Sequence, residues 1–236
     1  MVHVLAVSDE VDERLCADPG LASGAELILA CGDLPFNYLR SLMDVLDIPL
    51  VFVPGNHDPD VSGYRRSRAG LMLRAGMPAR VPWPPGAINV DGTVAEVCGL
   101  RIAGLGGSLR YHDGPNQYSE RQQAWRARRL VARARWGRRR DPRAVDVLLT
   151  HAPPRGVGDG DDPPHRGFEA LHRAIERLRP AWLLHGHVHP YGAEAPDTVV
   201  GTTRVRNVVG RHQFDIAETE RVYTGHCAPP DRVPES

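Results

Sequence analysis

Side chains able to bind metal ions follow five short apolar segments of this sequence. The segments span residues 2–7, 26–31, 49–53, 145–149 and 182–184. The residues that follow them are Asp9, Asp33, Asn56 with His57, His151, and His187 with His189. Such a mixture of carboxylate, amide and imidazole donors suits Mn, Fe or Zn rather than Ca or metals bound by thiolates.

Two ions held by such residues could hydrolyse a phosphate ester. At a separation of about 3.5–4 Å they activate a hydroxide and hold the phosphoryl oxygens during an in-line displacement. The ions need a bridging carboxylate, and Asp33 is the natural candidate. We assign His57 as the transition-state stabiliser or general acid, because it follows the ligand Asn56 and can point into the site without binding metal. Asp33 and His57 are therefore the predicted catalytic residues.

Each motif alone also has a simpler interpretation. Gly32-Asp33 and residues 55–58 could form turns, because Gly, Asn and Asp favour them. A turn explains His187-Val188-His189 less well, since a His-x-His pair at a strand end grips a metal economically. Taken together and in this order, the motifs favour a metal site.

The apolar segments predict strands, and residues 38–47 predict an amphipathic helix between two of them. Strand, helix and strand in succession indicate an α/β fold with a parallel sheet. Metal-binding residues at the carboxyl ends of such strands would converge at one edge. Residues 88–90 and 93–97, separated by Asp91-Gly92, predict a hairpin. Further helices are expected over 119–136 and 168–179.

Bulk properties place few other limits on function. The 236 residues, 42% of them hydrophobic, fit one domain over 1–225 with a disordered tail over 226–236. Net charge is zero, which gives no overall signature of polyanion binding. We expect a cytoplasmic protein, because the sequence shows no signal peptide and no membrane-spanning segment, and its four cysteines resemble free thiols.

The order of the motifs resembles that of the calcineurin-like metallophosphoesterases. Residues 106–111 and 165–169 are similar to a small bacterial branch of that family. The resemblance implies a four-layer αββα sandwich of two mixed β-sheets flanked by helices. It also implies that Asp9 and His189 hold a first metal, that Asp33 bridges, and that Asn56, His151 and His187 hold the second.

One position departs from the family pattern. The family opens with Asp-x-His, whereas this sequence has Asp9-Glu10-Val11, and valine cannot bind metal. We therefore expect a weaker first site, or a preparation with a single ion. Water, substrate, Glu10 or the more distant His112 could complete the first site.

The substrate is expected to be a small phosphorylated compound, either a phosphomonoester or a phosphodiester. Arg110, Asn37 and Tyr111 are candidate substrate-binding residues, since arginine can bind phosphate bidentately and an aromatic ring can stack on an organic group. The alternative is a metal-retaining scaffold or protein-binding module with little activity, which the valine at position 11 favours.

Nine arginines between Arg126 and Arg143 could contact nucleic acid. The sequence contains no lysine, so arginine takes the place of lysine throughout, and a solvated helix face is the favoured interpretation. In that interpretation Trp125, Leu130, Val131 and Trp136 face the core.

Overall fold

Two mixed β-sheets form the centre of the protein. The structure is a computed structural model that describes residues 1–136, 144–190 and 195–217. In the first sheet, with order β16-β1-β2-β3-β7, only β16 runs antiparallel to its neighbour. The bounds of its strands, in that order, are Gly210–Ile216, Val2–Ser8, Leu27–Ala30, Leu50–Phe52 and Ile88–Asn89.

The second sheet has the order β14-β15-β13-β12-β9-β8, and its two edge strands are antiparallel to their neighbours. The central strands are parallel, so their carboxyl ends share one edge. The bounds, in the same order, are Thr198–Val200, Thr203–Asn207, Trp182–His185, Val147–Thr150, Leu100–Leu105 and Val94–Val97.

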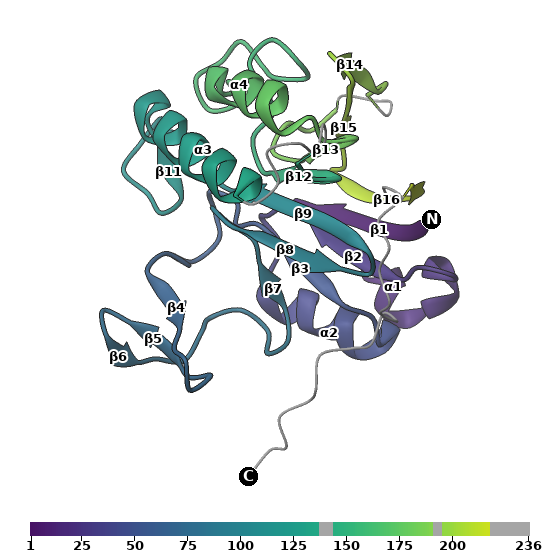
Figure 1. Cartoon of the computed structure of the whole chain (residues 1–236). Helices are drawn as coiled ribbons and strands as arrows, with labels where there is room; N and C mark the ends of the chain where they lie inside the picture. Colours follow the sequence, from purple (N-terminus) through teal and green to yellow (C-terminus); the bar gives the residue numbers. More distant parts are fainter. Residues whose placement is uncertain (137–143, 191–194, 218–236) are drawn as a thin grey trace.

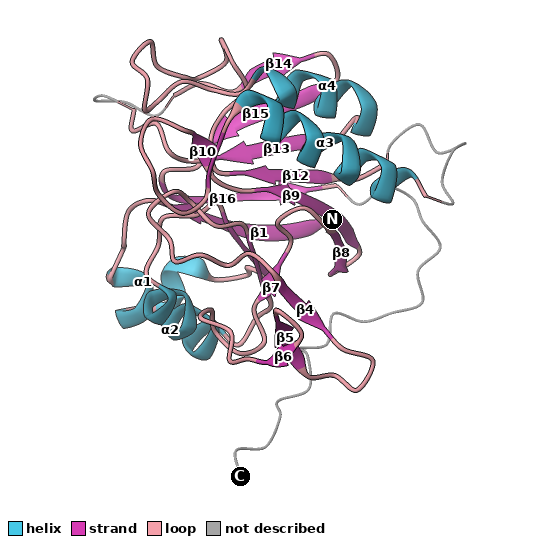
Figure 2. Ribbon diagram, turned by 90° about the vertical axis from the view of Figure 1, so that its left-hand side faces the viewer, coloured by secondary structure: helices cyan, strands magenta, loops and turns pink. Residues whose placement is uncertain are grey.

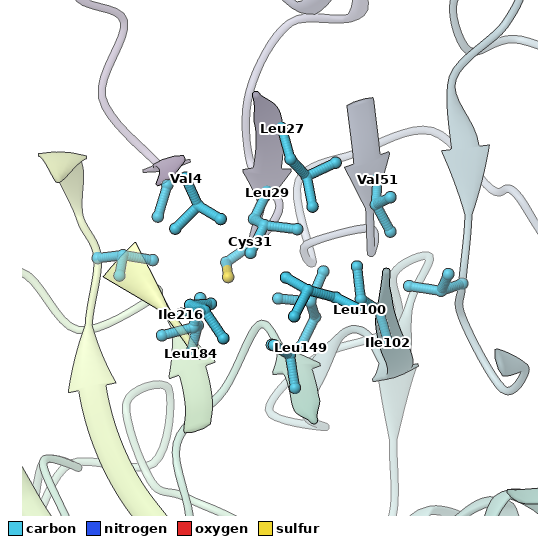
Figure 3. Close-up of a cluster of buried hydrophobic side chains, with 14 of the residues drawn as sticks. Val4, Leu27, Leu29, Cys31, Val51, Leu100, Ile102, Leu149, Leu184 and Ile216 are labelled. Carbon is cyan, nitrogen blue, oxygen red and sulfur yellow. The ribbon is translucent and has the colours of Figure 1, made fainter. Parts of the chain in front are cut away.

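The two sheets pack face to face, and helices cover both outer faces (Figures 1 and 2). Between the sheets lies an apolar layer that includes Val4, Leu29, Val51, Ile102 and Leu149 (Figure 3). The helices covering the first sheet are α1 (Arg14–Ala17), the 3-10 helix Pro19–Ala22 and α2 (Phe36–Leu46); those covering the second are α3 (Glu120–Arg135) and α4 (Glu169–Leu178). The predicted αββα sandwich is therefore the observed fold.

Small elements extend the edges of this sandwich. A three-stranded antiparallel sheet, which the sequence did not predict, forms from β4, β5 and β6, and a two-stranded parallel one from β10 and β11. Their bounds are Tyr64–Arg66, Met72–Arg74, Met77–Pro78, Ser108–Leu109 and Gln117–Tyr118. No helix within residues 1–136, 144–190 and 195–217 has the length and apolar character needed to cross a bilayer.

The hairpin predicted around Asp91-Gly92 is wrong. Strand β7 pairs with β3 in the first sheet, whereas β8 pairs with β9 in the second, so this segment carries the chain from one sheet to the other. The real hairpin joins β8 to β9 through Cys98 and Gly99, which both have positive φ, at 48° and 75°. Two residues with positive φ are what the tight turn favoured in hairpins requires.

The inward orientation predicted for Trp125 in α3 and for Trp136 directly after it is also wrong. Trp125 and Trp136 are 56% and 87% exposed. The buried stripe instead comprises Gln123, Ala127, Leu130 and Ala134. These positions repeat at the spacing of one helical face, which leaves both indoles outside it. The predicted tail over 226–236 and the arginines at 137–143 lie outside the described residues.

The expectation of free thiols holds for Cys16 and Cys31. Cys227 lies outside the described residues.

Candidate metal centre

The predicted metal-binding residues lie where the carboxyl ends of strands from both sheets meet. Asp9 and Asp33 follow β1 and β2, and Asn56 follows β3, all in the first sheet. His151 follows β12, and His187 follows β13, in the second sheet. The two groups are joined there, since the backbone N–H of His187 donates a hydrogen bond to the Asp9 carboxylate Oδ2 at 2.9 Å.

Four of these side chains form a compact group. One ligand atom from each of Asp33, His151 and His187 lies within 4.8 Å of the others. His151 Nε2 is 3.2 Å from Asp33 Oδ2 and 3.0 Å from Asn56 Oδ1. His151 is fully buried, and Asn56 and His187 are 3% and 7% exposed. A carboxylate, an amide oxygen and two imidazoles therefore converge at a largely buried position, called the pocket below.

Backbone carbonyls fix the orientation of both imidazoles. His151 Nδ1 donates to the carbonyl of Cys31, and His187 Nε2 donates to the carbonyl of Pro164, each at 2.7 Å. A carbonyl only accepts, so in the neutral form of each histidine the opposite ring nitrogen carries the lone pair. Histidines that bind metals hold their second ring nitrogen in this way.

Without metal, a proton holds the group together. Burial disfavours a charge on His151, but the neighbouring Asp33 carboxylate overcomes that effect and raises the pKa of His151 to about 9. Burial also opposes ionisation of Asp33, yet the charge and hydrogen bond of His151 lower the pKa of Asp33 below its ordinary value. His187 stays neutral, because burial and the charge of His151 lower its pKa to about 3.

The backbone takes unusual conformations to build this pocket. Asp9, Asp33 and His187 have φ of 60°, 54° and 70°, a region that costs a non-glycine residue of order 1–3 kcal/mol. Gly186 allows the loop after β13 to lie directly against the end of β1, because a Cβ at this position would overlap the side chains of Ser8 and Asp9. Three such residues close to one another among the predicted ligands are typical of a functional site.

His57 lies at the exposed rim of the pocket, and its N–H donates to Asp33 Oδ1 at 2.8 Å. The next residue, Asp58, is buried and accepts from Gly55 N at 2.7 Å and from Asp33 N at 3.0 Å. Burial, and then the nearby Asp33 charge, raise the pKa of Asp58 to about 6 despite these two hydrogen bonds. The loop that carries Asn56 and His57 is thus tied directly to Asp33.

Asn116 secures the same loop from the other side. Its Nδ2 donates to the carbonyls of Gly55 at 2.9 Å and Asp58 at 3.0 Å. Sequence reasoning assigned no role to Asp58 or Asn116. The Gly-Asn-His-Asp motif contained Asp58 and could have flagged it, whereas Asn116 lies in a turn far away in sequence and gave no signal.

The other two predicted ligands lie beside the compact group rather than within it. Asp9 Oδ2 accepts from His187 N and from Ser8 Oγ, at 2.9 and 2.5 Å. His189 is about half exposed, and its Nδ1 is 3.1 Å from Glu10 Oε1. Val11 is 45% exposed and offers no donor atom.

The three predicted substrate-binding residues differ in position. The Tyr111 hydroxyl accepts from Asn56 Nδ2 at 3.3 Å, so this ring borders the pocket. Arg110 instead donates to the Gln117 carbonyl at 3.3 Å, at the base of α3. Asn37 is exposed in the first turn of α2. The structure brings only Tyr111 into contact with a predicted metal ligand.

The loop of residues 153–167 also borders the pocket. Its Pro164 carbonyl holds His187, and the His165 ring lies 5.5 Å from the His187 ring. Asp162 Oδ2 accepts a hydrogen bond from His165 Nδ1 at 2.7 Å, which fixes the His165 imidazole beside that of His187.

The donor set fits a divalent transition metal. Asp33 Oδ2, Asn56 Oδ1 and His151 Nε2 already face one another, and His187 Nδ1 has its lone pair available. Such a site needs a deprotonated His151, so a metal ion would take the place of the proton that His151 carries. Oxygen and imidazole donors favour Mn, Fe or Zn over softer ions.

Comparison with known proteins agrees with this geometry. The sequence model of a family described as Calcineurin-like phosphoesterase matches residues 11–191. A curated relative, UPF0046 protein T07D4.2 of Caenorhabditis elegans, is 31% identical over 105 residues, which are 44% of this chain and 24% of the relative. The chain thus matches about a quarter of that relative's length.

Two solved structures share the fold at low sequence identity. The protein TT1561 of Thermus thermophilus matches with a TM-score of 0.54 and 19% identity, over 87% of this chain and 88% of the other. A second crystal structure matches with a TM-score of 0.57 and 17% identity, over 87% and 89% of the two chains.

Proposed function

The chain belongs to the calcineurin-like phosphoesterase family, and from this premise we propose that it hydrolyses small phosphomonoesters or phosphodiesters with the help of divalent metal ions. One observation carries the proposal. Asp33, Asn56, His151 and His187 converge, and backbone carbonyls hold one ring nitrogen of each imidazole, which leaves the other nitrogen of each as the potential metal ligand. Histidines that bind metal are oriented in this way, by a hydrogen bond from the second ring nitrogen.

The residues divide into two groups of ligands. Asn56, His151 and His187 would hold one ion. Asp9 and His189 would hold the other, and Asp33 would bind both. When bound, such ions supply the attacking hydroxide and neutralise charge on the phosphoryl oxygens. Manganese is the favoured ion, with iron or zinc as alternatives, given the donor mixture.

His57 would act on the leaving group. It lies at the open rim, its backbone is anchored to Asp33, and its side chain is free to meet the oxygen on which negative charge develops. The Tyr111 ring would border the organic part of the substrate, since its hydroxyl contacts Asn56. Arg110 and Asn37 would need to rotate towards the pocket to contact phosphate.

The test is turnover of aryl phosphate esters by the purified protein with added Mn²⁺. We expect hydrolysis of a nitrophenyl mono- or diester, a loss of about 100-fold or more in kcat for His57→Ala with metal still bound, and loss of metal for Asp33→Asn. If His57 protonates the leaving oxygen, its loss costs more for a phenyl ester than for a nitrophenyl ester, because phenolate is the poorer leaving group.

His3→Ala is the matched control, because His3 lies on β1 and pairs with Asp215 outside the pocket. It should leave turnover unchanged. Absence of both turnover and bound metal in the native protein would defeat the proposal.

The second candidate is a metal-retaining scaffold with little activity, and Val11 is the observation that favours it. Val11→His separates the two. A large gain in turnover would identify a decayed catalytic site, whereas an already active native protein that gains little would support the enzyme.

A further inference from the structure

The segment that follows β1 places a second carboxylate beside the half of the site that lacks a ligand. Asp9 turns the backbone through a positive φ of 60°, and Glu10 N donates back to the Ser8 carbonyl at 2.6 Å. This turn carries the Glu10 side chain across to the loop after β13. There its Oε1 lies 3.1 Å from His189 Nδ1.

Stability does not explain the Glu10–His189 pair. The two side chains are 61% and 52% exposed. An ion pair at such exposure contributes between about 0 and 1 kcal/mol, because water screens the charges and both side chains lose rotamer freedom. A carboxylate in contact with an imidazole, on the residue that follows the carboxylate of Asp9 in the chain, is instead a pair of donors suited to a cation.

His112, the other residue considered for this role, is held elsewhere. Its ring nitrogens lie 3.2 and 3.3 Å from Gln117 Nε2, and its ring packs edge-on against Tyr111 at 4.4 Å. In the described part of the chain no contact joins His112 to Asp9 or His189. Glu10 is thus the group positioned to complete the set.

We propose that Glu10, together with Asp9 and His189, binds the first divalent cation and takes the place of the ligand that Val11 cannot supply. The proposal rests on the proposed function, since it assumes that Asp33 and its neighbours bind the second cation. It also predicts a preference. Compared with a histidine, an oxygen donor in this position reduces the advantage of Zn²⁺ over Mn²⁺ at the first site.

The test is Mn²⁺ binding to the chelator-treated full chain, measured by titration calorimetry and by equilibrium dialysis. The native protein should bind two ions, one of them more weakly. In Glu10→Gln the weaker dissociation constant should rise at least about tenfold while the tighter one is unchanged, because one ligand of one ion has been removed. Glu10 is exposed, so circular dichroism should show an unchanged fold.

Glu13→Gln is the matched control, since Glu13 is exposed three residues further along and the change removes the same charge. It should bind both ions as the native protein does. A Zn²⁺ titration should show that replacing Mn²⁺ with Zn²⁺ raises the affinity of the weaker site less in the native protein than in Val11→His.

Unchanged binding of both ions by Glu10→Gln would overturn the proposal, as would a native protein that binds only one ion. In either case, binding of the tighter ion would still support the proposed function. A native protein that binds no ion would overturn both.

Discussion

The charge shared by Asp33 and His151 makes a quantitative prediction for the metal-free protein. Burial alone would keep His151 neutral, yet Asp33 raises its pKa from 6.5 to about 9. A pKa raised in the folded state adds stability that is fully present below pH 6.5 and lost as the pH rises to 9. At 1.36 kcal/mol per pH unit, this shift corresponds to about 3 kcal/mol.

Asp33→Asn removes the cause of the shift. Without the carboxylate, burial keeps His151 neutral, so the variant should lack this pH-dependent contribution. In the presence of a chelator, urea unfolding should show the variant about 3 kcal/mol less stable than the native protein near pH 6, with the gap closing by about pH 9.5. Titrating groups remote from Asp33 and His151 contribute equally to both proteins and cancel in the comparison.

Two results would refute this reasoning. One is a stability gap between native protein and Asp33→Asn that does not change between about pH 6 and 9.5. The other is a His151 ring-proton resonance that titrates near pH 6.5, the ordinary histidine value, in the native protein.

Two further predictions concern the backbone that builds the pocket. Gly32→Ala should lower the free energy of unfolding by at least about 2 kcal/mol and abolish metal binding, because φ is +94° and the added Cβ would overlap Gly55 and approach His151 Nδ1 to 2.9 Å. Gly70→Ala is the control, since Gly70 has a similar φ of +84° but open space around it. Thermal unfolding should show that Gly70→Ala lowers the free energy of unfolding by only about 1 kcal/mol. Asn116→Ala should lower the free energy of unfolding by about 2–3 kcal/mol and reduce kcat, because it leaves the carbonyls of Gly55 and Asp58 without the Asn116 donor. A urea unfolding curve identical to that of the native protein would contradict this prediction.

Much of the fold could be predicted because its central strands are short, apolar and directly followed by chemically distinctive residues. Short apolar segments located β1, β2, β3, β12 and β13, and an amphipathic pattern located α2 and α4. Strand pairing was harder. The segment around Asp91-Gly92 has the composition of a hairpin turn, but β7 finds its partner in β3, and pairing between segments distant in sequence leaves no local signal.

The candidate site could be predicted as a set of residues but not as an arrangement. Sequence order identified Asp33, Asn56, His151 and His187, which the structure brings together. Only tertiary structure shows that His189 pairs with Glu10 and that Arg110 turns away, since both depend on how loops from different strands meet. The carbonyls that orient the imidazoles belong to Cys31 and Pro164, and a backbone group cannot be recognised from residue type.

Anomalous diffraction from crystals grown with Mn²⁺ tests the central claim most directly. The account predicts a manganese peak enclosed by Asp33 Oδ2, Asn56 Oδ1, His151 Nε2 and His187 Nδ1, with those atoms at bonding distance. A crystal with manganese bound only elsewhere, and with His151 still hydrogen-bonded to Asp33, would contradict it.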